Sequence, residues 1–387
     1  MVKGAILSPS SVMSTMDATT KPEPFGMKVA IVRFPINDVG GIDSYYINLR
    51  KGLERLGHNV HFYHCVPQTR KKVGYKTSRE YIHEGEVLSF RTEEDVQEGV
   101  EILNWFDVVI MLHPGPHPVK GLRDTDWEDN WMQYYEGIAR PIIQIHHDEN
   151  WEKTNEWCSE VADECDLVVA AQHRFMPAVE DYPASCNKIW EYFPLDIPQQ
   201  KPVVLPGRNY FRGIVATQWL QWKGHKYFVP LLKQIAPHVT IDFYGAGIQY
   251  HYLAKDGKLE DRIGIDHHAG YNRGGRHPYH GFVEYDRVME AMSQADFSID
   301  LSSRGYTNMT HWEPFMFGTI PFMHEGVASD PYNEIPRDLC IVFNDYEELV
   351  TRINHFEYDP DKASQGYNFI RSTSDCEDVA SRILENL

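Results

Sequence analysis

The chain has 387 residues, of which 42% are hydrophobic and 13% aromatic, and its net charge is −19. This length suits two domains rather than one core, and no segment offers the roughly 18 apolar residues of a membrane span. The acidity argues against coating nucleic acid by overall charge, although it leaves room for a local basic groove. Six scattered cysteines without a C-x-x-C pair fit a reducing cytoplasm and indicate neither metal nor disulfides.

The first segment, 1–26, is rich in Ser, Thr and Pro and lacks the apolar stretch of a secretion signal, so we expect a disordered tail. Near-continuous apolar runs at 29–34, 60–65, 107–112, 141–146 and 166–171 predict strands covered on both faces. Apolar residues spaced by three and four over 42–56 predict a helix that Gly57 ends. Strand, helix and strand with short connections predict a parallel βαβ unit, and a first Rossmann-like domain over 27–195.

A Pro-rich stretch predicts a linker at 196–210, after which the alternation restarts. Strands are expected at 213–218, 240–245, 296–302, 319–324 and 339–344, giving a second Rossmann-like domain over 211–370. A final helical segment, 371–387, is expected to pack back toward the first domain. The predicted fold class is therefore α/β, with two Rossmann-like domains facing each other across a cleft. Neither half has G-x-G-x-x-G after a strand, which disfavours a dinucleotide oxidoreductase.

A glycine-containing turn follows the first strand of each half. Gly40-Gly41 stands where backbone amides at a helix N-terminus can meet a phosphate or a sugar, although a plain turn explains the pair equally. Lys223 with Gly224 combines an ammonium charge with free amides, as a diphosphate requires. A solvated lysine beside a turn is the alternative there.

The segment RGYTNMTHWEPFMFGTIP, residues 304–321, gathers hydroxyl, imidazole and carboxylate groups ahead of an apolar run. With a helix beginning near 308–310, free backbone amides would face the cleft. Glu313 lies one turn in and can accept both hydroxyls of a ribose, whereas an exposed carboxylate on a capped helix is the alternative. The cleft-facing candidates for binding a phosphate and a sugar are Gly40, Gly41, Gly245, Thr307, Asn308, Met309, Thr310, His311 and Glu313.

His147 and Asp148 follow the predicted strand 141–146, at the mouth of the expected cleft. Adjacent residues of a strand point to opposite faces, so His146 and His147 do not easily share a metal ion. We interpret His147 with Asp148 as a polar pair aimed at a reacting sugar or an acceptor hydroxyl, with structural hydrogen bonding as the alternative. The histidine-rich tract 265–281 lacks ligand spacing and is interpreted as a loop, and no metal site is predicted.

A local basic segment, QTRKKVGYKTSR at 68–79, contains no acidic residue in a strongly acidic chain. An anionic polymer could dock on its cations, with a tyrosine available for stacking on a base. A solvated loop is the equally weighted alternative. The candidate residues for docking an anionic polymer are Arg70, Lys71, Lys72, Tyr75, Lys76 and Arg79.

The order of these motifs resembles the GT-B glycosyltransferases, and among them the DNA α-glucosyltransferases of T-even bacteriophages. Thr-His-x-Glu at 310–313 is followed by Gly-Thr-Ile-Pro at 318–321, as in that family. Trp-Lys-Gly at 222–224, the His147–Asp148 pair and Gly-His-x-Val at 57–60 match in the same order. The resemblance spans most of the chain, over residues 27–345, and its Thr-His-x-Glu string is the most specific part.

The resemblance implies a retaining transfer from a UDP-sugar, carrying glucose or a pentose such as arabinose, to the hydroxymethyl group of a pyrimidine in double-stranded DNA. The acceptor base would be 5-hydroxymethylcytosine, flipped out of the duplex, in phage DNA protected from restriction in the cytoplasm of the infected host. His147, Asp148 and Lys223 would be catalytic, the first domain would take the acceptor, and the basic segment would hold the strand. No membrane partner and no firm metal requirement follow from the resemblance.

Two positions depart from the family pattern. An arginine is common five residues before the lysine, where this chain has Gln218 unless Arg212 substitutes for it, and a glutamate seven residues before Glu313 is replaced by Tyr306. These changes leave the donor sugar open. Two other functions also stay open: a GT-B enzyme with a lipid or cell-surface glycan acceptor, which the acidity favours, and a non-catalytic module that binds sugar nucleotides or DNA.

Overall fold

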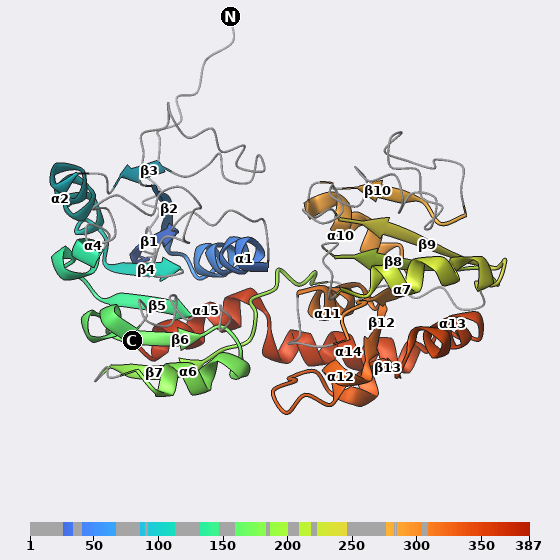
Figure 1. Cartoon of the computed structure of the whole chain (residues 1–387). Coiled ribbons are helices and arrows are strands. Elements are labelled where there is room, and N and C mark those ends of the chain that lie inside the picture. The colour runs from blue at the N-terminus through green and yellow to red at the C-terminus, as the bar shows by residue number, and fades with distance from the viewer. Residues whose placement is uncertain are drawn as a thin grey trace, which may run out of the picture.

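The protein contains two parallel sheets, each with helices on both faces (Figure 1). The first sheet has the order β3-β2-β1-β4-β5-β6-β7 and the second the order β10-β9-β8-β11-β12-β13. In each the strand order reverses beside its central first strand, at β1/β4 and at β8/β11, which makes both sheets doubly wound. The computed structural model describes residues 26–33, 41–66, 86–89, 92–112, 132–146, 159–182, 186–199, 209–217, 223–245, 276–281, 283, 285–303 and 309–387.

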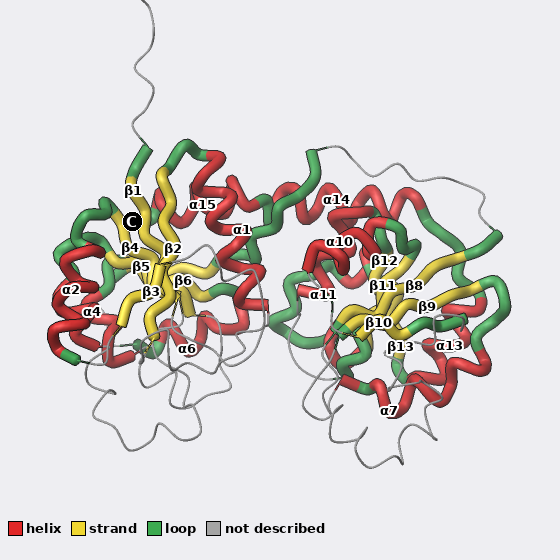
Figure 2. The backbone as a smooth tube through the Cα atoms, turned by 90° about the horizontal axis from the view of Figure 1, so that it is seen from above, coloured by secondary structure: helices red, strands yellow, loops and turns green. Residues whose placement is uncertain are grey.

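The first half runs from β1 to β7. Its strands are β1 (Lys28–Arg33), β2 (Asn59–Val66), β3 (Glu86–Ser89), β4 (Val108–Leu112), β5 (Ile142–His146), β6 (Leu167–Ala170) and β7 (Asn187–Trp190). Figure 2 shows α2 and α4 on one side of this sheet and α1 and α15 on the other. The helices of this half are α1 (Gly41–Arg55), α2 (Glu93–Leu103), α4 (Met132–Gly137), η2 (Ala162–Glu164), η3 (His173–Phe175) and α6 (Met176–Glu180).

The second half holds the other sheet. Its strands are β8 (Phe211–Ala216), β9 (Val239–Tyr244), β10 (Tyr279–Gly281), β11 (Phe297–Ile299), β12 (Ile320–His324) and β13 (Ile341–Phe343). Its first helices are α7 (His225–Phe228), η5 (Val229–Gln234), α10 (Tyr285–Ser293), α11 (Met309–Trp312), η6 (Glu313–Phe317) and α12 (Glu325–Ala328). The helices that follow among the described residues are η7 (Arg337–Leu339), α13 (Tyr346–Asn354), α14 (Pro360–Thr373) and α15 (Cys376–Glu385).

All ten strands expected from apolar runs are present, with shifted bounds, because strands covered on both faces by helices must be apolar on both faces. Three short strands were not foreseen: β3, β7 and β10. The interpretation of 265–281 as a loop is wrong at its end, where Tyr279 begins β10 and pairs with Phe243. The Tyr279 side chain is buried and its hydroxyl donates to the Gly245 carbonyl at 2.7 Å, which holds this edge strand in place.

Helix α1 forms as the spacing of its apolar residues predicts, and buries Tyr45, Leu49 and Leu53. Its other contact is with the C-terminal helix α15, which lies beside it (Figures 1 and 2). A Cβ built on Gly52 would stand 2.0 Å from the Cys376 carbonyl oxygen. A glycine is therefore needed where these two helices, more than 300 residues apart, approach each other.

The chain crosses between the halves twice, and the two crossings run side by side. Leu195 donates its amide to the Ser374 carbonyl at 2.7 Å, and the Cys376 amide donates to the Leu195 carbonyl at 2.9 Å. The segment predicted as an open linker begins here, yet Leu195 and Ile197 are buried. Pairing with the second crossing explains this burial, since it removes the backbone from water.

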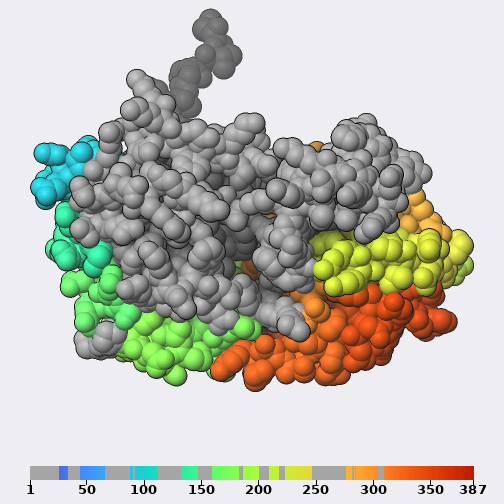
Figure 3. Space-filling model, in the orientation of Figure 1, coloured from blue at the N-terminus to red at the C-terminus, as the bar shows by residue number. Residues whose placement is uncertain are grey.

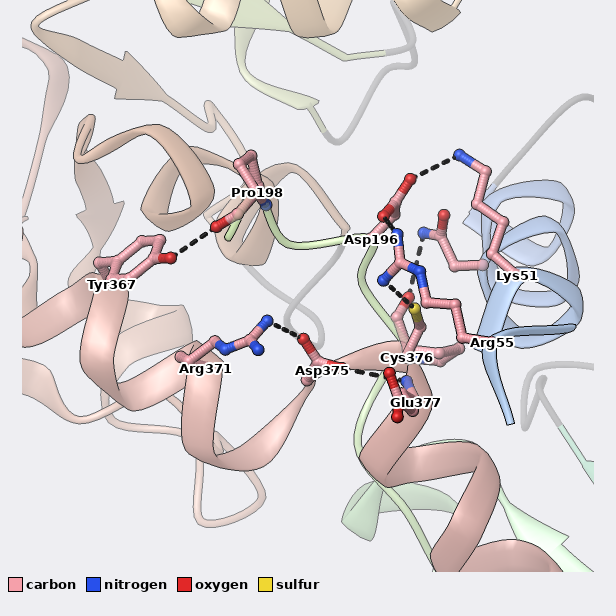
Figure 4. A network of polar contacts seen from close by, with 11 residues as sticks. Lys51, Arg55, Asp196, Pro198, Tyr367, Arg371, Asp375, Cys376 and Glu377 are labelled. Carbon is pink, nitrogen blue, oxygen red and sulfur yellow. Dashed lines mark hydrogen bonds and ion pairs between the residues drawn. The ribbon is translucent and has the colours of Figure 1, made fainter. Parts of the chain in front are cut away.

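Polar contacts fasten the crossings to α1 (Figure 4). Asp196 accepts hydrogen bonds from Lys51, at 2.8 Å, and from Arg55. On the other side, the Tyr367 hydroxyl of α14 donates to the Pro198 carbonyl at 2.6 Å.

A second contact between the halves lies beyond the crossings. Arg174 makes an ion pair with Asp330 at 3.1 Å, and the His173 amide donates to Glu334. Figure 3 shows the green surface of the first half meeting the orange surface of the second along the lower edge of the view. In Figure 1 the arrowheads of β4 and β9 point toward each other, so the carboxyl ends of the two sheets face the same interdomain region. Among the helices of the described ranges, none has the length and apolarity to cross a membrane.

Candidate active site

The candidate site lies where the second sheet reverses its strand order, at the carboxyl ends of β8 and β11. Doubly wound sheets bind their ligands at this position, because the two βα connections leave in opposite directions. Lys223 follows β8 and Asp300 follows β11, and the Lys223 Nζ stands 3.7 Å from the Asp300 Oδ2. The two side chains are 10% and 1% exposed, so the alternative of a solvated lysine is wrong.

Gly224 allows this approach. Its φ of 65° lies in the left-handed region, which favours glycine. A Cβ at this position would lie 2.3 Å from the Leu301 carbonyl oxygen and 2.0 Å from the Tyr346 hydroxyl. Tyr346 in turn donates to the Leu301 carbonyl at 2.9 Å. The absence of a side chain therefore brings the Lys223 turn against the backbone that carries Asp300.

Asp300 is a hub of polar contacts. The Ser302 amide donates to its Oδ1 and the Thr310 hydroxyl to its Oδ2, both at 2.7 Å. Burial alone would raise the pKa of this carboxyl, but Lys223, His311 and the two hydrogen bonds outweigh burial and hold it well below its usual range. Asp300 is therefore ionised at neutral pH, and it ties the turn after β11 to the first turn of α11.

Two buried histidines flank this hub. Burial lowers the pKa of His225 to about 3, so its imidazole is neutral at physiological pH even though Asp300 opposes the shift. His311 is also buried, on α11, and its positive charge is one of the influences that lower the pKa of Asp300. Lys223 and His311 are thus the two positive groups that act on Asp300, and Lys223 is the one that forms an ion pair with it.

Glu313 begins η6 and is also buried, so the alternative of an exposed carboxylate is wrong. The Tyr285 hydroxyl donates to its Oε1 at 2.7 Å. Burial raises the pKa of Glu313 to about 7, against the lowering influence of that hydrogen bond. Tyr285 also forms a side-chain hydrogen bond with Ser44 of α1, so this pair connects the second half to the first.

Four further predicted residues are described. Met309 and Thr310 begin α11, with Met309 buried under it. Gly41 is the first residue of α1, as its turn predicts. Gly245 follows β9 with a φ of 112°, and its carbonyl is taken by Tyr279. The structure thus gathers Lys223, Thr310 and His311 around Asp300, with Glu313 on the adjoining turn.

The remaining predicted residues lie outside the described part of the chain. His146, the last described residue before one of these gaps, is fully buried, and its Nδ1 lies 3.0 Å from the Tyr182 hydroxyl. The His146 imidazole therefore belongs to the core of the first half. The undescribed predictions are Gly40, His147, Asp148, Thr307 and Asn308 and the basic cluster Arg70, Lys71, Lys72, Tyr75, Lys76 and Arg79.

Sequence reasoning missed Asp300 and Tyr285. Asp300 carries a usable signal, because it is a charged residue that directly follows the short apolar run of β11. Arg212, a possible substitute for the missing family arginine, lies near the amino end of β8, where its Nε donates to Asp242 at 2.6 Å. It is therefore at the wrong end of the strand. Within the described residues, no group of three or more His, Cys, Asp or Glu side chains could hold a metal ion.

The two doubly wound sheets and the helix that returns to the first form the GT-B fold, which confirms the predicted fold class. No protein-family model matches the chain, and no curated protein matches it in sequence. An alpha-glucosyltransferase in complex with UDP-glucose and DNA containing an abasic site has a similar structure, with a TM-score of 0.70, 15% identity, and coverage of 93% of this chain and 99% of that one.

Two further solved structures are similar over the same span. An alpha-glucosyltransferase in complex with UDP and a 13-mer DNA containing an HMU base has a TM-score of 0.68 and 16% identity, covering 93% of this chain and 99% of that one. Anabaena Alr3699/HepE in complex with UDP and glucose has a TM-score of 0.65 and 17% identity, covering 93% and 98%. The resemblance seen in the motifs therefore extends, as a likeness of fold, over nearly the whole chain.

Proposed function

We propose that the protein is a retaining glycosyltransferase that takes its sugar from a UDP-sugar. The observation that carries this proposal is the buried Lys223–Asp300 pair, fastened to Thr310 at the switch point of the second sheet. An ammonium group held at the carboxyl ends of β8 and β11 suits the diphosphate of a sugar nucleotide. The solved structures of similar fold, whose descriptions name UDP or UDP-glucose, support the same donor class.

The proposed chemistry places the positive charge where negative charge develops. As the bond from the anomeric carbon to the diphosphate oxygen breaks, the acceptor oxygen bonds to the same face of that carbon, and its proton passes to the leaving phosphate. Lys223 stabilises the departing UDP as a preorganised cation in a site of low dielectric constant. His147 and Asp148 position the sugar and the acceptor hydroxyl in this proposal. Asp300 is engaged by Lys223, Ser302 and Thr310, and Glu313 by Tyr285, so neither is an evident double-displacement nucleophile.

Glu313 is proposed to accept hydroxyls of the donor ribose. Its Oε1 already accepts from Tyr285, so the ribose would share the carboxylate with that hydroxyl. An ionised carboxylate accepts these bonds more strongly than a protonated one. Because burial raises the pKa of Glu313 to about 7, donor binding is expected to strengthen as the pH rises through neutrality.

We further propose that the acceptor is a hydroxymethylated pyrimidine in DNA, with 5-hydroxymethylcytosine as the first choice. The motif resemblance to DNA α-glucosyltransferases supports this acceptor, as do the alpha-glucosyltransferase structures that contain DNA with an HMU base or an abasic site. A base inside a duplex must be flipped out to react, and the basic segment 70–79 would hold the strand. The reaction would then take place in the cytoplasm of an infected bacterium, and protect phage DNA from restriction.

A second acceptor class has its own support. HepE has nearly the same similarity of fold, and its structure is a complex with UDP and glucose. The net charge of −19 also makes binding to a polyanion less favourable over most of the surface. A glycan or lipid acceptor is therefore the competing form of the proposed function.

Nucleoside mass spectrometry tests both forms. The protein is incubated with hydroxymethylcytosine DNA and, in turn, UDP-glucose and UDP-arabinose, with unmodified DNA as the control. A hexose or pentose mass on the modified base alone supports the DNA acceptor and identifies the donor. UDP release without any added mass on DNA indicates another acceptor. No UDP release with any donor or acceptor contradicts the proposed enzyme and favours a module that only binds.

A further inference from the structure

We infer that Asp300 is a positioning residue that holds the Lys223 ammonium in place for the diphosphate of the donor. This inference rests on the proposed function, and goes beyond it by assigning a role to a carboxylate that would itself repel the diphosphate. Its basis is the arrangement of contacts around the two side chains.

The Lys223 ammonium needs a counter-charge at this location. Its side chain is only 10% exposed, and burying an ammonium without a counter-charge costs much free energy. Asp300 is the acidic side chain that pairs with it in the described part of the chain. Without this carboxylate, the Lys223 side chain would have to turn toward water and leave the carboxyl ends of β8 and β11.

The geometry of the pair leaves the hydrogen-bond donors of Lys223 available to a ligand. At 3.7 Å, Nζ and Oδ2 attract each other as charges, but are too far apart for a proper hydrogen bond. An ammonium group has three donors and no acceptor, and no hydrogen bond from Nζ occurs among the described residues. The donors of Lys223 are therefore oriented by Asp300 without being consumed by it, and phosphate oxygens can accept them.

Asp300 itself cannot easily follow the lysine. One of its oxygens accepts from the Ser302 amide and the other from the Thr310 hydroxyl, each at 2.7 Å. Gly224 presses the lysine turn against Leu301 on the same loop. Asp300 is thus held by a backbone amide and a hydroxyl, and the lysine turn by close backbone packing. A binding group is held in this way before its ligand arrives.

The competing explanation is that Lys223 and Asp300 form an ion pair that only stabilises the fold. Asp242 is the control for this explanation, because it is a buried carboxylate of the same sheet that also forms ion pairs. It is buried in β9 of the same sheet, where it accepts from Arg212 at 2.6 Å and pairs with His280 at 2.8 Å. Removing either carboxylate leaves a cation without its partner and should destabilise the fold. The inference requires only Asp300 to affect the binding of a diphosphate.

Isothermal titration calorimetry with UDP and with uridine separates the two explanations. The variants are Asp300→Asn, Lys223→Ala, the double variant and Asp242→Asn, each checked for folding by thermal unfolding. We expect Asp300→Asn to weaken UDP binding about tenfold and to change uridine binding by less than about twofold, since uridine lacks the diphosphate. In the Lys223→Ala background the same substitution should not weaken UDP binding any further, because Asp300 then has no lysine to position. Asp242→Asn should bind both ligands like the parent protein.

Three results overturn the inference: equal loss of UDP and uridine affinity, additive effects of Asp300→Asn and Lys223→Ala, or tighter UDP binding by Asp300→Asn. If Asp300→Asn fails to fold, Thr310→Val replaces it, because it removes one anchor of Asp300 at nearly constant volume. We then expect about threefold weaker UDP binding, again only when Lys223 is present, and unchanged binding would overturn the inference. A parent protein that binds UDP while Asp300→Asn binds it equally well refutes this inference alone. A parent protein that binds neither UDP nor UDP-glucose refutes the proposed function as well.

Discussion

The Asp300 region and the Glu313 region contain carboxyl groups of nearly equal burial, at 2% and 3% exposure, and their pKa values move in opposite directions. Burial disfavours the charged form in both. Asp300 overcomes it because it faces Lys223 and accepts from Ser302 and Thr310, whereas Glu313 accepts one hydrogen bond from Tyr285 and has no cation beside it in the described residues. The charge of a buried carboxyl therefore depends on its partners more than on its depth.

The opposite pKa shifts of Asp300 and Glu313 suit the two carboxyl groups to different roles in the site. Asp300 keeps a constant charge at physiological pH and can hold a cation in place. Glu313, with a pKa raised to about 7, changes its charge near neutrality and makes the adjoining part of the site dependent on pH.

The largest effect is expected from Lys223→Ala, which removes the cation from the Asp300 region. We expect kcat/KM for UDP-glucose to fall by about a thousandfold, because one preorganised charge at the leaving group contributes on the order of 4 kcal/mol in the transition state. Steady-state kinetics of UDP release measures this loss. Lys233→Ala, at an exposed lysine of η5, is the matched control and should keep full activity. A folded Lys223→Ala variant with parental activity would remove the lysine from the mechanism.

Glu313→Gln tests the other carboxyl through the pH dependence of stability. The folded-state pKa of about 7 lies above the ordinary 4.5, so the folded protein binds more protons between these values, and stability falls as the pH rises through them. The parent should lose roughly 3 kcal/mol relative to the Gln variant between pH 4 and pH 8. Urea unfolding at several pH values measures the difference. Burial also raises the pKa of Glu334 to about 7, but Glu334 is present in both proteins. Its contribution to the pH dependence therefore cancels in the comparison of parent and variant. Parallel pH profiles would contradict the raised pKa of Glu313.

Gly224→Ala asks whether the backbone imposes the Lys223–Asp300 pair. The new Cβ would clash with the Leu301 carbonyl oxygen and the Tyr346 hydroxyl, and the alanine would have to adopt a left-handed backbone conformation. We therefore expect a loss of about 2–3 kcal/mol in the free energy of unfolding, together with weaker UDP binding. Gly57→Ala is the control, because Gly57 has a φ of 87° with open space around it. It should cost about 1 kcal/mol and leave UDP binding unchanged. Equal losses in the two variants would show that the close approach at Gly224 is unimportant.

Tyr285→Phe makes the Glu313 region still less like the Asp300 region, since it removes the hydrogen bond that lowers the pKa of Glu313. We expect a loss of about 1 kcal/mol in stability, and a shift of the pH midpoint of UDP-glucose binding to higher pH. Tyr279→Phe is the control, because the Tyr279 hydroxyl donates to the Gly245 carbonyl and not to Glu313. It should lower the stability by a similar amount without moving the pH midpoint of UDP-glucose binding. A midpoint that stays in place would separate Tyr285 from the titration of Glu313.

The smallest effect is expected for Lys51→Ala at the crossing between the halves. Lys51 and Asp196 are 45% and 30% exposed, and Arg55 also contacts Asp196, so solvent screens the pair and a second cation remains. Urea unfolding should show a loss below about 0.5 kcal/mol. A loss comparable to that of the buried Asp300 pair would mean that exposure does not distinguish the two ion pairs.

Much of the fold could be read from local patterns. Runs such as 141–146 and 166–171 are apolar enough to form only buried strands, and the spacing of apolar residues in 42–56 produces helix α1. The short strands β3, β7 and β10 were not predicted, because edge strands of three or four residues are too short to show a hydrophobic periodicity. The returning helix α15 was expected, but the close contact of Gly52 with Cys376 depends on residues more than 300 positions apart.

By itself, the sequence determined that this protein has two Rossmann-like domains and that Lys223 and Gly224 follow the first strand of the second. It also placed Thr310 and His311 at the start of a helix with Glu313 one turn in, because apolar runs, helix starts and turn residues act locally. Only the tertiary structure decided that Asp300 faces Lys223 and that Tyr285 faces Glu313. These pairings join residues that are distant in sequence, and they exist only once β8 and β11 lie side by side. The charge state of each carboxyl follows from those neighbours, and so could not be read from the chain alone.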